Sequence, residues 1–432
     1  MRTVLVVAGS DSGGGAGIQA DLKALAALEV HAATALTAVT AQNTQGVVAT
    51  EPLSVETVRA QIQAVRDDLV VHATKTGMLY SPHIVKVVAE ELASLDAPLV
   101  VDPVLVATSG SSLHTSGLPE ALQEHLLPMA TLLTPNLPEA ETLTGVPVRE
   151  IQEMKDAAQA LHALGPEAVL VKGGHLEGKL VDILYDGTSF QSFPGHRYRN
   201  ELHGSGCAYA STIAGYLALD RGLSESIQAA RKRVAAGFAT AYAVGHGLRL
   251  INAGYREDRW QVWTAVRDAT EELLGFLDPD LVPEVGVNLA YALPAADDLG
   301  DVCAITGRIV RVGARAAAVG PPAFGASRHV ARVILAAMEF DPARRAAMNL
   351  RYDAGLMDRA RGAGLAIGSF DRKDEPQDAR TMDWGTREAI RRAKAFPDLI
   401  YDLGGPEKLA MVRLLGDSPG EVVDRARKVA GP

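Results

Sequence analysis

The sequence predicts an α/β protein, in which a mostly parallel sheet with helices on both faces is followed by a second, smaller α/β domain. Three observations support this fold class. Over about the first 250 residues, short apolar runs such as TVLVVAG alternate with helical patterns such as AGIQADLKALAAL, which is typical of βαβ units. Polar and glycine-rich clusters follow the apolar runs. After Gly247 the character of the sequence changes.

The remaining elements can be placed in order along the chain. Further strands of the first domain are expected at HAATALTAV, ATKTGML, APLVVDPV, ATLLTPN and EAVLVKGG, each followed by a helical pattern. LRLINAGYREDR predicts a linker, and a helix from Trp260 to Leu274 opens the second domain. Its strands are expected at EVGVNLAYAL, VCAITGRIVRV, AMNLRYD, GLAIGSF, DLIYDLGG and MVRLLG. We therefore predict domains at 1–248 and 262–432, joined by a linker at 249–261.

Composition excludes several classes of protein. Of the 432 residues, 47% are hydrophobic and 22% charged, which suits a globular protein. A net charge of −10 argues against a nucleic-acid or membrane-surface partner, because both need basic faces. Cys207 and Cys303 are too few for a disulfide framework and show no zinc spacing. No apolar segment has signal-peptide or membrane-spanning character, so we expect a cytoplasmic homo-oligomer that acts on small molecules.

The glycine-rich stretch AGSDSGGGAGIQAD follows a strand and opens a helix, which is the setting of a dinucleotide-binding fingerprint. That fingerprint needs an acidic residue at the end of the second strand to hold the ribose. Here the second strand runs into TAQNTQG instead, and the GK[ST] of a P-loop is absent. A dinucleotide-binding domain is therefore disfavoured.

Clusters that follow other strands supply what phosphoryl transfer needs, namely a metal, a cation, an anion cradle and a base. Asn136 and Glu139 lie one helical turn apart after a strand, and with Asp102 they suit Mg²⁺, held directly or through water. Lys172 ends another strand, where its ammonium group can reach the phosphates of ATP. Ligands bind beyond the carboxyl ends of strands in such sheets, so we expect these groups to meet at one edge.

The stretch HGSGC supplies the cradle and the base. Gly204, Ser205 and Gly206 begin a helix, where backbone N–H groups form an anion hole for the transferring phosphoryl group. Cys207 follows directly. Because a helix N-terminus lowers the pKa of a thiol, we expect a thiolate that takes the proton from a substrate hydroxyl. Taken alone, Cys207 is better explained as a small core residue than as a base, and a solvated surface charge is the alternative for Lys172.

In their order, these motifs resemble the hydroxymethylpyrimidine kinase / hydroxymethylpyrimidine-phosphate kinase family, which has the ribokinase-like fold. The resemblance covers about residues 1 to 248 and implies that ATP and Mg²⁺ are used to phosphorylate the pyrimidine and then its monophosphate. The resemblance also implies that Cys207 is the base that activates the hydroxymethyl group of the substrate. The pyrimidine pocket that it implies consists of Asp21, Gln42 and Met78. Thr108 stands where some members have lysine, and the related pyridoxal kinase activity is the alternative.

The second domain carries basic residues at a helix start. Arg308 lies on a predicted strand, and Arg328 and His329 begin the helix SRHVARVILAAM, which Ser327 caps. A capped helix start surrounded by basic side chains is typical of a phosphate or pyrophosphate site. The alternative is that these residues only decorate an exposed helix.

The motifs GR, FGASRH, NLRYD and SFDRKDEP resemble a thiamine-phosphate synthase domain that is found fused behind this kinase, over about residues 262 to 432. The resemblance implies loss of pyrophosphate from hydroxymethylpyrimidine diphosphate and condensation with thiazole phosphate. The roles that it implies fall on Arg308 and His329 for catalysis, on Arg328, Asn349 and Arg351 for substrate binding, and on Asp374 for metal binding. A sensor that binds thiamine phosphate without making it is the alternative.

Overall fold

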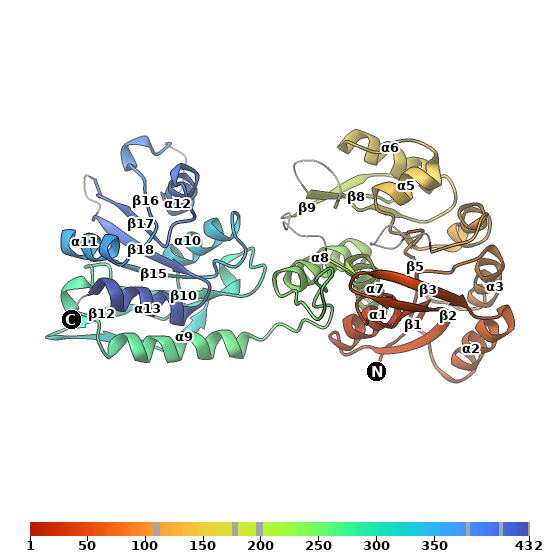
Figure 1. Cartoon of the computed structure of the whole chain (residues 1–432), viewed down its shortest axis with the longest axis horizontal. Helices are drawn as coiled ribbons and strands as arrows, with labels where there is room; N and C mark the ends of the chain where they lie inside the picture. The colour runs from red at the N-terminus through yellow and green to blue at the C-terminus, as the bar shows by residue number, and fades with distance from the viewer. Residues whose placement is uncertain (107–112, 175–179, 196–201, 377–380, 406–408, 431–432) are drawn as a thin grey trace. The chain divides into compact units, whose positions relative to one another are not determined.

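A computed structural model of the chain describes residues 1–106, 113–174, 180–195, 202–376, 381–405 and 409–430. The chain divides into two units with separate cores, unit 1 at Met1–Arg256 and unit 2 at Glu257–Pro432 (Figure 1). In the part of the chain that the structure describes, none of the helices combines the length and the apolar character that crossing a membrane requires.

Unit 1 is built on one large sheet, with the strand order β3-β2-β1-β4-β5-β6-β7-β8-β9. The strands are β1 (Thr3–Asp11), β2 (His31–Asn43), β3 (Gly46–Pro52), β4 (Ala73–Thr76), β5 (Leu99–Val101), β6 (Leu132–Leu133), β7 (Val169–Val171), β8 (Leu180–Tyr185) and β9 (Phe190–Gly195). From β2 across to β7 they run parallel, whereas β3, β8 and β9 pair antiparallel. The predicted mostly parallel sheet is confirmed.

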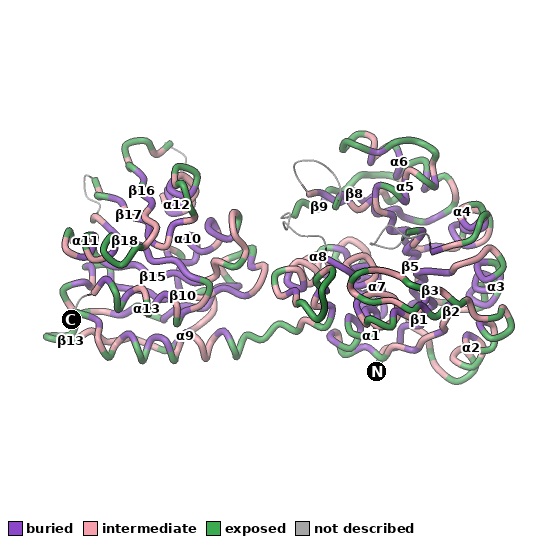
Figure 2. The backbone as a smooth tube through the Cα atoms, viewed as in Figure 1, coloured by how far each residue is buried: buried purple, intermediate pink, exposed green. Residues whose placement is uncertain are grey.

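Helices cover both faces of this sheet, as Figure 2 indicates by its buried strands and its partly exposed helices. The helices are α1 (Gly17–Ala26), α2 (Val55–Asp68), α3 (Pro82–Leu92), α4 (Leu118–Ala121), α5 (Leu137–Thr144), α6 (Ile151–His162), α7 (Ser205–Ala218) and α8 (Leu223–Ala239), with the short turns η1 (Leu122–Leu126) and η2 (Leu127–Met129). Side chains alternate between the faces along β1. Val4 and Val6 pack with α1, α7 and α8, whereas Leu5 and Val7 pack with α2, α3 and α6.

Two connections differ from the prediction of a helix after every strand. β2 turns directly into β3, because the Asn43 side chain accepts hydrogen bonds from the amides of Gln45 and Gly46. β7 is followed by β8 and β9, two strands that the sequence analysis did not predict, and in the turn between them Asp186 accepts from the amide of Ser189 over 2.7 Å. The sequence signals NTQG and DGTS are those of tight turns, which close hairpins at the edges of the sheet.

Unit 2 contains a mixed sheet with the order β14-β11-β10-β15-β18-β17-β16 and a separate hairpin, β12-β13. The strands are β10 (Leu289–Ala292), β11 (Val302–Ile305), β12 (Ile309–Val312), β13 (Arg315–Ala318), β14 (Pro322–Phe324), β15 (Ala346–Arg351), β16 (Ile367–Ser369), β17 (Leu399–Asp402) and β18 (Met411–Gly416). The single strand expected at VCAITGRIVRV is wrong. Gly307 and Arg308 have φ of +69° and +73°, and this left-handed turn separates β11 from β12.

Helices also cover both faces of the sheet in unit 2. They are α9 (Arg259–Leu274), α10 (His329–Met338), α11 (Ala354–Gly362), α12 (Thr381–Arg392) and α13 (Pro419–Ala430), with the short turns η3 (Pro279–Leu281), η4 (Leu299–Asp301) and η5 (Arg372–Asp374). One face packs against α9, α11 and α13, and the other against α10 and α12. The second α/β domain is therefore present as predicted.

The segment between the units is shorter than the linker predicted at 249–261. Leu250 and Ile251 are buried in unit 1, and Leu250 forms isolated bridges with His203 and Tyr242. Helix α9 begins at Arg259. The apolar side chains of LRLI thus belong to the core of unit 1, and residues 254–258 remain as the connection.

Candidate active site

Three of the sequence-predicted groups meet at one edge of the sheet in unit 1. Asp102 follows β5, Lys172 follows β7, and Gly206 lies in the first turn of α7. The Nζ atom of Lys172 lies 2.8 Å from Oδ1 of Asp102, and the Thr134 hydroxyl donates to the same oxygen over 3.2 Å. A Cβ atom on Gly206 would lie 3.6 Å from the Lys172 Nζ and 3.8 Å from the Asp102 Oδ2. The turn therefore lies directly beside the ion pair.

Glu139 lies close to this ion pair and is buried. Burial, together with the nearby charge of Asp102, raises the pKa of Glu139 to about 7, although Lys172 opposes the rise. Its Oε2 accepts from the backbone amide of Asn136, and Oδ1 of Asn136 accepts from the amide of Glu139, each over 2.8 Å. Because the Asn136 side chain is used to cap α5, this geometry does not support the cofactor-binding role expected for it.

Gly204, Ser205 and Gly206 form the predicted anion hole and are called the anion turn from here on. This turn packs against the loop that follows β1. Gly204 has φ of +87°, and a Cβ atom there would lie 1.8 Å from the carbonyl oxygen of Gly15, so this position requires glycine. Gly204 precedes α7, whose first turn contains Ser205 and Gly206. The backbone of Gly17 lies near the Cys207 thiol and favours its charged form. Gly204, Ser205, Gly206 and Cys207 therefore lie where the sequence placed them.

The protonation state expected for Cys207 is wrong. Burial raises the pKa of the Cys207 thiol to about 11; nearby Asp21 and Asp102 add to the rise, and Lys75 opposes it. Although Cys207 is half-buried, the atoms packed around its thiol disfavour the thiolate more than the helix start favours it. At neutral pH the resting residue is a thiol.

A buried ion pair beside this turn was missed by the sequence analysis. Lys75 of β4 and Asp21 of α1 are both 0% exposed, and Lys75 Nζ lies 3.0 Å from each carboxylate oxygen. The Ser211 hydroxyl of α7 donates to Oδ1 of Asp21 over 2.7 Å. Because the Asp21 carboxylate is enclosed and fully occupied, the structure does not support its predicted contact with the pyrimidine. Asp21 instead neutralises Lys75.

The other two pocket residues have different surroundings. Gln42 is half-buried at the end of β2, and its Nε2 lies 3.0 Å from Nε2 of His203. The same His203 nitrogen lies 2.9 Å from Oδ2 of Asp11, which also accepts from the amides of the glycine loop. Met78 is buried, and it packs with Ala38. His203 and Asp11 were not predicted, although both lie within the quoted motifs. Thr108 lies outside the described residues.

In unit 2, basic side chains gather near the start of α10. Arg372 Nε lies 2.5 Å from Oδ1 of Asp402, and Arg413 Nη1 lies 2.8 Å from Oδ2 of the same carboxylate. Burial lowers the pKa of His329 to about 4, and the charges of Arg413, Arg308 and Arg372 lower it further in that order. Arg308 is exposed, and its guanidinium group donates to the carbonyl of Val285. The catalytic roles of Arg308 and His329 remain predictions. Since His329 is neutral at pH 7, it does not supply a positive charge.

The remaining sequence-predicted residues of unit 2 are less well placed. Asn349 is buried, and it accepts from the amide of Asn288 and donates to the carbonyl of Gly286, so its amide serves the fold rather than a substrate. Arg328 and Arg351 are exposed. Their substrate-binding roles remain predictions.

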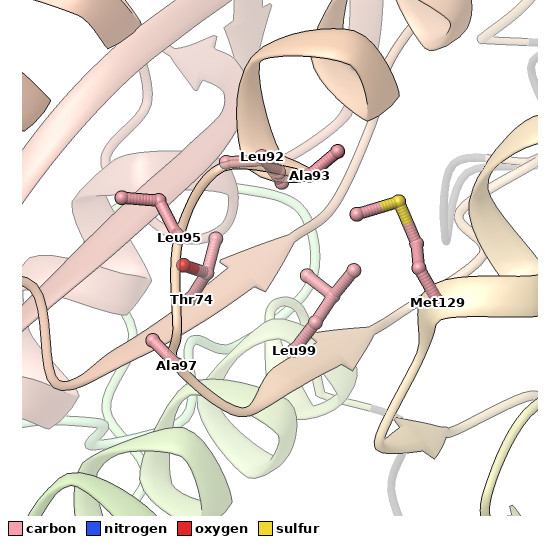
Figure 3. Close-up of a pocket in the computed structure, with 7 residues that line it drawn as sticks. All are labelled: Thr74, Leu92, Ala93, Leu95, Ala97, Leu99 and Met129. Atoms are coloured by element: carbon pink, nitrogen blue, oxygen red, sulfur yellow. The ribbon is translucent and has the colours of Figure 1, made fainter.

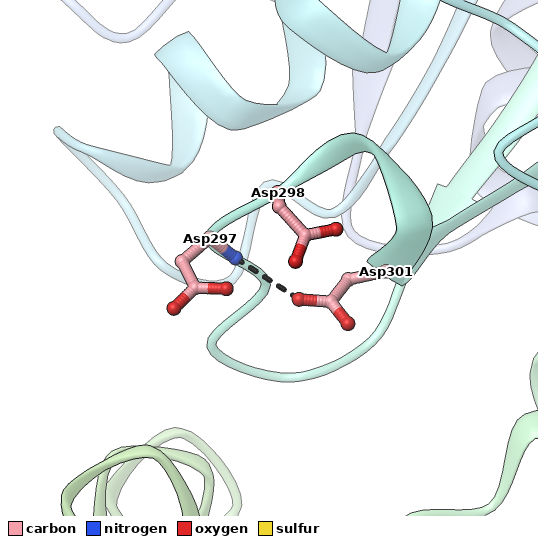
Figure 4. A group of neighbouring side chains, drawn as sticks. All are labelled: Asp297, Asp298 and Asp301. Carbon is pink, nitrogen blue, oxygen red and sulfur yellow. Dashed lines mark hydrogen bonds between the residues drawn. The ribbon is translucent and has the colours of Figure 1, made fainter. Parts of the chain in front are cut away.

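The metal-binding role predicted for Asp374 is not supported by its surroundings. Asp374 is exposed, and Arg392 lies 3.4 Å from its carboxylate. Among the described residues, the group of three or more possible ligand side chains that lie close enough together to share an ion is Asp297, Asp298 and Asp301 (Figure 4). The Asp301 carboxylate already accepts from the amide of Asp297 and lies 3.6 Å from Arg259.

One apolar cavity of about 280 Å³ lies in unit 1 away from these groups (Figure 3). It is lined by Thr74, Leu92, Ala93, Leu95, Ala97, Leu99 and Met129. These residues lie where β4 and β5 begin, whereas Asp102 and the anion turn lie where the parallel strands end. The cavity is therefore separate from the candidate active site.

Comparison with known proteins agrees with both halves of the chain. Residues 11–252 match the phosphomethylpyrimidine kinase family, and residues 265–428 match thiamine-phosphate synthase ThiN. The chain is 47% identical over 253 residues to the hydroxymethylpyrimidine/phosphomethylpyrimidine kinase of Streptomyces coelicolor, which covers 58% of this chain and 94% of that protein. It is 32% identical over 430 residues to the bifunctional thiamine biosynthesis protein ThiDN of Methanocaldococcus jannaschii, which covers 99% and 98% of the two chains.

A solved structure supports the fold of unit 1. The pyridoxal kinase of Staphylococcus aureus, in complex with AMP-PCP and pyridoxal, is 32% identical and superposes with a TM-score of 0.55, covering 59% of this chain and 94% of that one. The match to the bifunctional enzyme extends over nearly the whole chain, which favours a pyrimidine kinase with a synthase over a pyridoxal kinase or a sensor. The chain belongs to the family of bifunctional thiamine biosynthesis enzymes, in which a phosphomethylpyrimidine kinase is joined to a thiamine-phosphate synthase.

Proposed function

We propose that unit 1 uses ATP and Mg²⁺ to phosphorylate hydroxymethylpyrimidine and then its monophosphate, and that unit 2 condenses the diphosphate with thiazole phosphate. The observation that carries the kinase half is the anion turn, which lies beside the Lys172–Asp102 ion pair with Cys207 directly after it. The use of ATP is supported by the related pyridoxal kinase whose structure contains AMP-PCP. Lys172 and the amides of the turn would hold the transferring phosphoryl group.

The residues at this edge fit Mg²⁺. Asp102 and Glu139 supply carboxylate oxygens, which are the ligands that this ion prefers. Burial raises the pKa of Glu139 to about 7, which indicates that the positive charge nearby does not balance two carboxylates. A divalent cation would supply the missing positive charge. When bound, Mg²⁺ draws charge from the phosphate oxygens. Asp102 also orients Lys172, whose ammonium group neutralises the same developing charge.

Cys207 is the proposed base for the substrate hydroxyl. With a pKa of about 11, its thiol must first lose its own proton, so the kinase reaction should speed up as the pH rises. The buried Lys75 ammonium favours the thiolate and, through Asp21, is held in place. Gln42 and Met78 remain the proposed contacts to the pyrimidine ring. The Gln42 amide would form hydrogen bonds with the polar atoms along one edge of the ring.

In unit 2, we assign the departing pyrophosphate to the basic side chains around α10. Breaking the bond between the pyrimidine methylene carbon and the diphosphate oxygen leaves the electron pair, and thus negative charge, on that oxygen. Arg308 and its neighbours would stabilise this charge. Neutral His329 can donate one hydrogen bond to it. Such a reaction depends on stabilisation of the leaving group more than on a base.

Incubation of the purified chain with ATP, Mg²⁺, hydroxymethylpyrimidine and thiazole phosphate tests both activities. Thiamine phosphate is the expected product, and omission of thiazole phosphate should cause the pyrimidine diphosphate to accumulate. A parallel reaction with pyridoxal measures the alternative kinase activity. Tight binding of thiamine phosphate without its formation from the diphosphate would contradict the synthase assignment and favour the sensor.

A further inference from the structure

Arg413 of unit 2 is a buried arginine whose hydrogen-bonding groups are largely unused. It lies in the middle of β18, where every residue is buried, and it is 1% exposed. Its Nη1 lies 2.8 Å from Oδ2 of Asp402, but without the alignment that a hydrogen bond requires. Nε and Nη2 have no hydrogen-bond partner among the described residues. Buried donors without partners are costly, so a native arginine of this kind calls for an explanation.

The charge around Arg413 is not balanced. Asp402 is also bound by Arg372, through Nε to Oδ1 at 2.5 Å and through Nη2 to Oδ2 at 3.2 Å. The amide of Gly404 donates to Oδ1 as well. One carboxylate thus faces two guanidinium groups, and this leaves an excess positive charge in a buried place. An anion bound there would provide the missing partner.

His329 adds a second unpartnered polar atom, which can donate when the single ring proton is on that nitrogen. Its Nε2 is buried and has no hydrogen-bond partner in the described part of the chain. The Arg413 guanidinium group lies over the Phe370 ring, 5.4 Å from its centre, and Phe370 belongs to the same apolar cluster as Val330 in the first turn of α10. After burial, the charge of Arg413 also contributes most to lowering the pKa of His329. His329 is also the first residue of α10, where backbone N–H groups have no partners within the helix. Helix amides, an imidazole and a guanidinium group therefore converge.

We propose that Arg413, together with Arg372 and His329, forms the binding site for the phosphate groups of an organic diphosphate at the N-terminus of α10. This inference rests on the proposed synthase function of unit 2 and names the residues that hold its anionic substrate. Asp402 acts as a positioning residue, because it fixes both guanidinium groups and leaves donors free for the ligand. The same donors hold the inorganic pyrophosphate that leaves.

The kinetic test uses the full chain with pre-made hydroxymethylpyrimidine diphosphate, thiazole phosphate and Mg²⁺. Arg413→Met should raise both the KM for the diphosphate and the inhibition constant of inorganic pyrophosphate by about tenfold to a hundredfold, as expected for loss of a charge-assisted hydrogen bond. The KM for thiazole phosphate should change by less than about threefold. Arg392→Met is the matched control, because Arg392 is an exposed arginine of α12, and it should leave all three constants unchanged.

Two further variants protect the test against misfolding. In Arg413→Met/Asp402→Leu, the buried carboxylate is removed together with the more deeply buried of its two arginines, and Arg372 is left nearer the surface. This variant should fold yet still bind pyrophosphate weakly. Arg413→Lys keeps the charge but loses the planar fork, and it should show an intermediate inhibition constant. Thermal unfolding of each variant confirms that unit 2 is folded.

The possible results separate this inference from the proposed function. A folded Arg413→Met chain with unchanged constants for diphosphate and pyrophosphate would overturn the inference while leaving the synthase intact. If the wild-type chain forms no thiamine phosphate, the proposed function fails. Calorimetric titration of inorganic pyrophosphate into wild type and Arg413→Met then decides the inference alone, since equal binding by both chains would contradict it.

Discussion

The two units arrange their buried charges differently. In unit 1 each buried cation near the active site has its own anion, Lys75 with Asp21 and Lys172 with Asp102. In unit 2, Arg372 and Arg413 share Asp402. A kinase receives a divalent cation together with its nucleotide, so its own residues can be close to neutral. A site that must stabilise a departing anion benefits from an excess of positive charge.

The units also differ in the base that they offer. Unit 1 places Cys207 beside its anion turn, with a thiol whose pKa burial raises to about 11. In unit 2 burial and the surrounding arginines lower the pKa of His329 to about 4, which makes it a weak base. This difference fits the two proposed functions. Unit 1 is proposed to remove a proton from a hydroxyl, and unit 2 to stabilise a leaving group.

The largest expected effect is on the base of unit 1. Cys207→Ala should slow phosphorylation of hydroxymethylpyrimidine by about a hundredfold to ten-thousandfold, which is the range for loss of a general base. Steady-state kinetics with saturating ATP measure the change. Cys303→Ala is the control, because Cys303 is buried in β11 of unit 2. Equal loss in both variants would show that the effect is not specific to the thiol beside the turn.

The next effect is on the balanced ion pairs of unit 1. Lys75→Met leaves the Asp21 carboxylate buried without its partner, and it should lower the free energy of unfolding by about 3–5 kcal/mol in urea titrations. Lys75→Met/Asp21→Leu should recover much of that loss. Lys86→Met, at an exposed position of α3, should change stability by less than about 0.5 kcal/mol. A Lys75→Met chain as stable as wild type would contradict the pairing.

The boundary between the two regions can be tested by truncation. A chain that ends at Arg256 keeps Leu250 and Ile251 in the core of unit 1, and it should fold and phosphorylate the pyrimidine. A chain that ends at Gly247 loses both side chains and should be less stable by about 3 kcal/mol, since each contributes roughly 1.5–3 kcal/mol before correction for residual burial in the unfolded state. Equal stability of the two fragments would place the boundary earlier.

A smaller effect is expected from the depressed pKa of His329, the only histidine after residue 246. Because the folded pKa of about 4 lies below the ordinary value of 6.5, the unfolded chain binds the proton first as the pH falls. Stability from this residue is present above about pH 6.5 and is lost towards pH 4, by at most about 3 kcal/mol. In His329→Gln, the free energy of unfolding of unit 2 should fall less between about pH 6.5 and pH 4 than it does in the wild-type chain. An identical pH dependence would contradict the shifted pKa.

Part of the active site could be predicted because the carboxyl ends of parallel strands meet at one edge. That rule alone predicts that Asp102, Lys172 and the anion turn lie close together, as they do in the structure. The protonation state of Cys207 could not be predicted in this way. The sequence shows that the thiol begins a helix, but the burial that outweighs the helix terminus depends on tertiary packing.

The buried charges could not be paired from the sequence, because each pairing depends on how two separate elements pack together. Lys75 pairs with Asp21 and Arg413 with Asp402, across different elements in each case. A signal was nevertheless present. Each cation is the only charged residue of a predicted strand, in ATKTGML and MVRLLG, where a buried charge requires a partner or a ligand. The edge hairpins are a simpler case. The turn signals NTQG and DGTS indicate them, whereas the βαβ pattern favours a helix after each strand.

The most direct test of the contrast between the units is the pH dependence of both reactions on the same chain. Between about pH 6 and pH 9, kcat/KM of the kinase reaction should rise steadily, because the proton must first leave a thiol with a pKa of about 11. Over the same range, kcat/KM of the synthase reaction should vary by less than about threefold, and Cys207→Ala should leave it unchanged. A kinase profile as flat as that of the synthase would contradict the account.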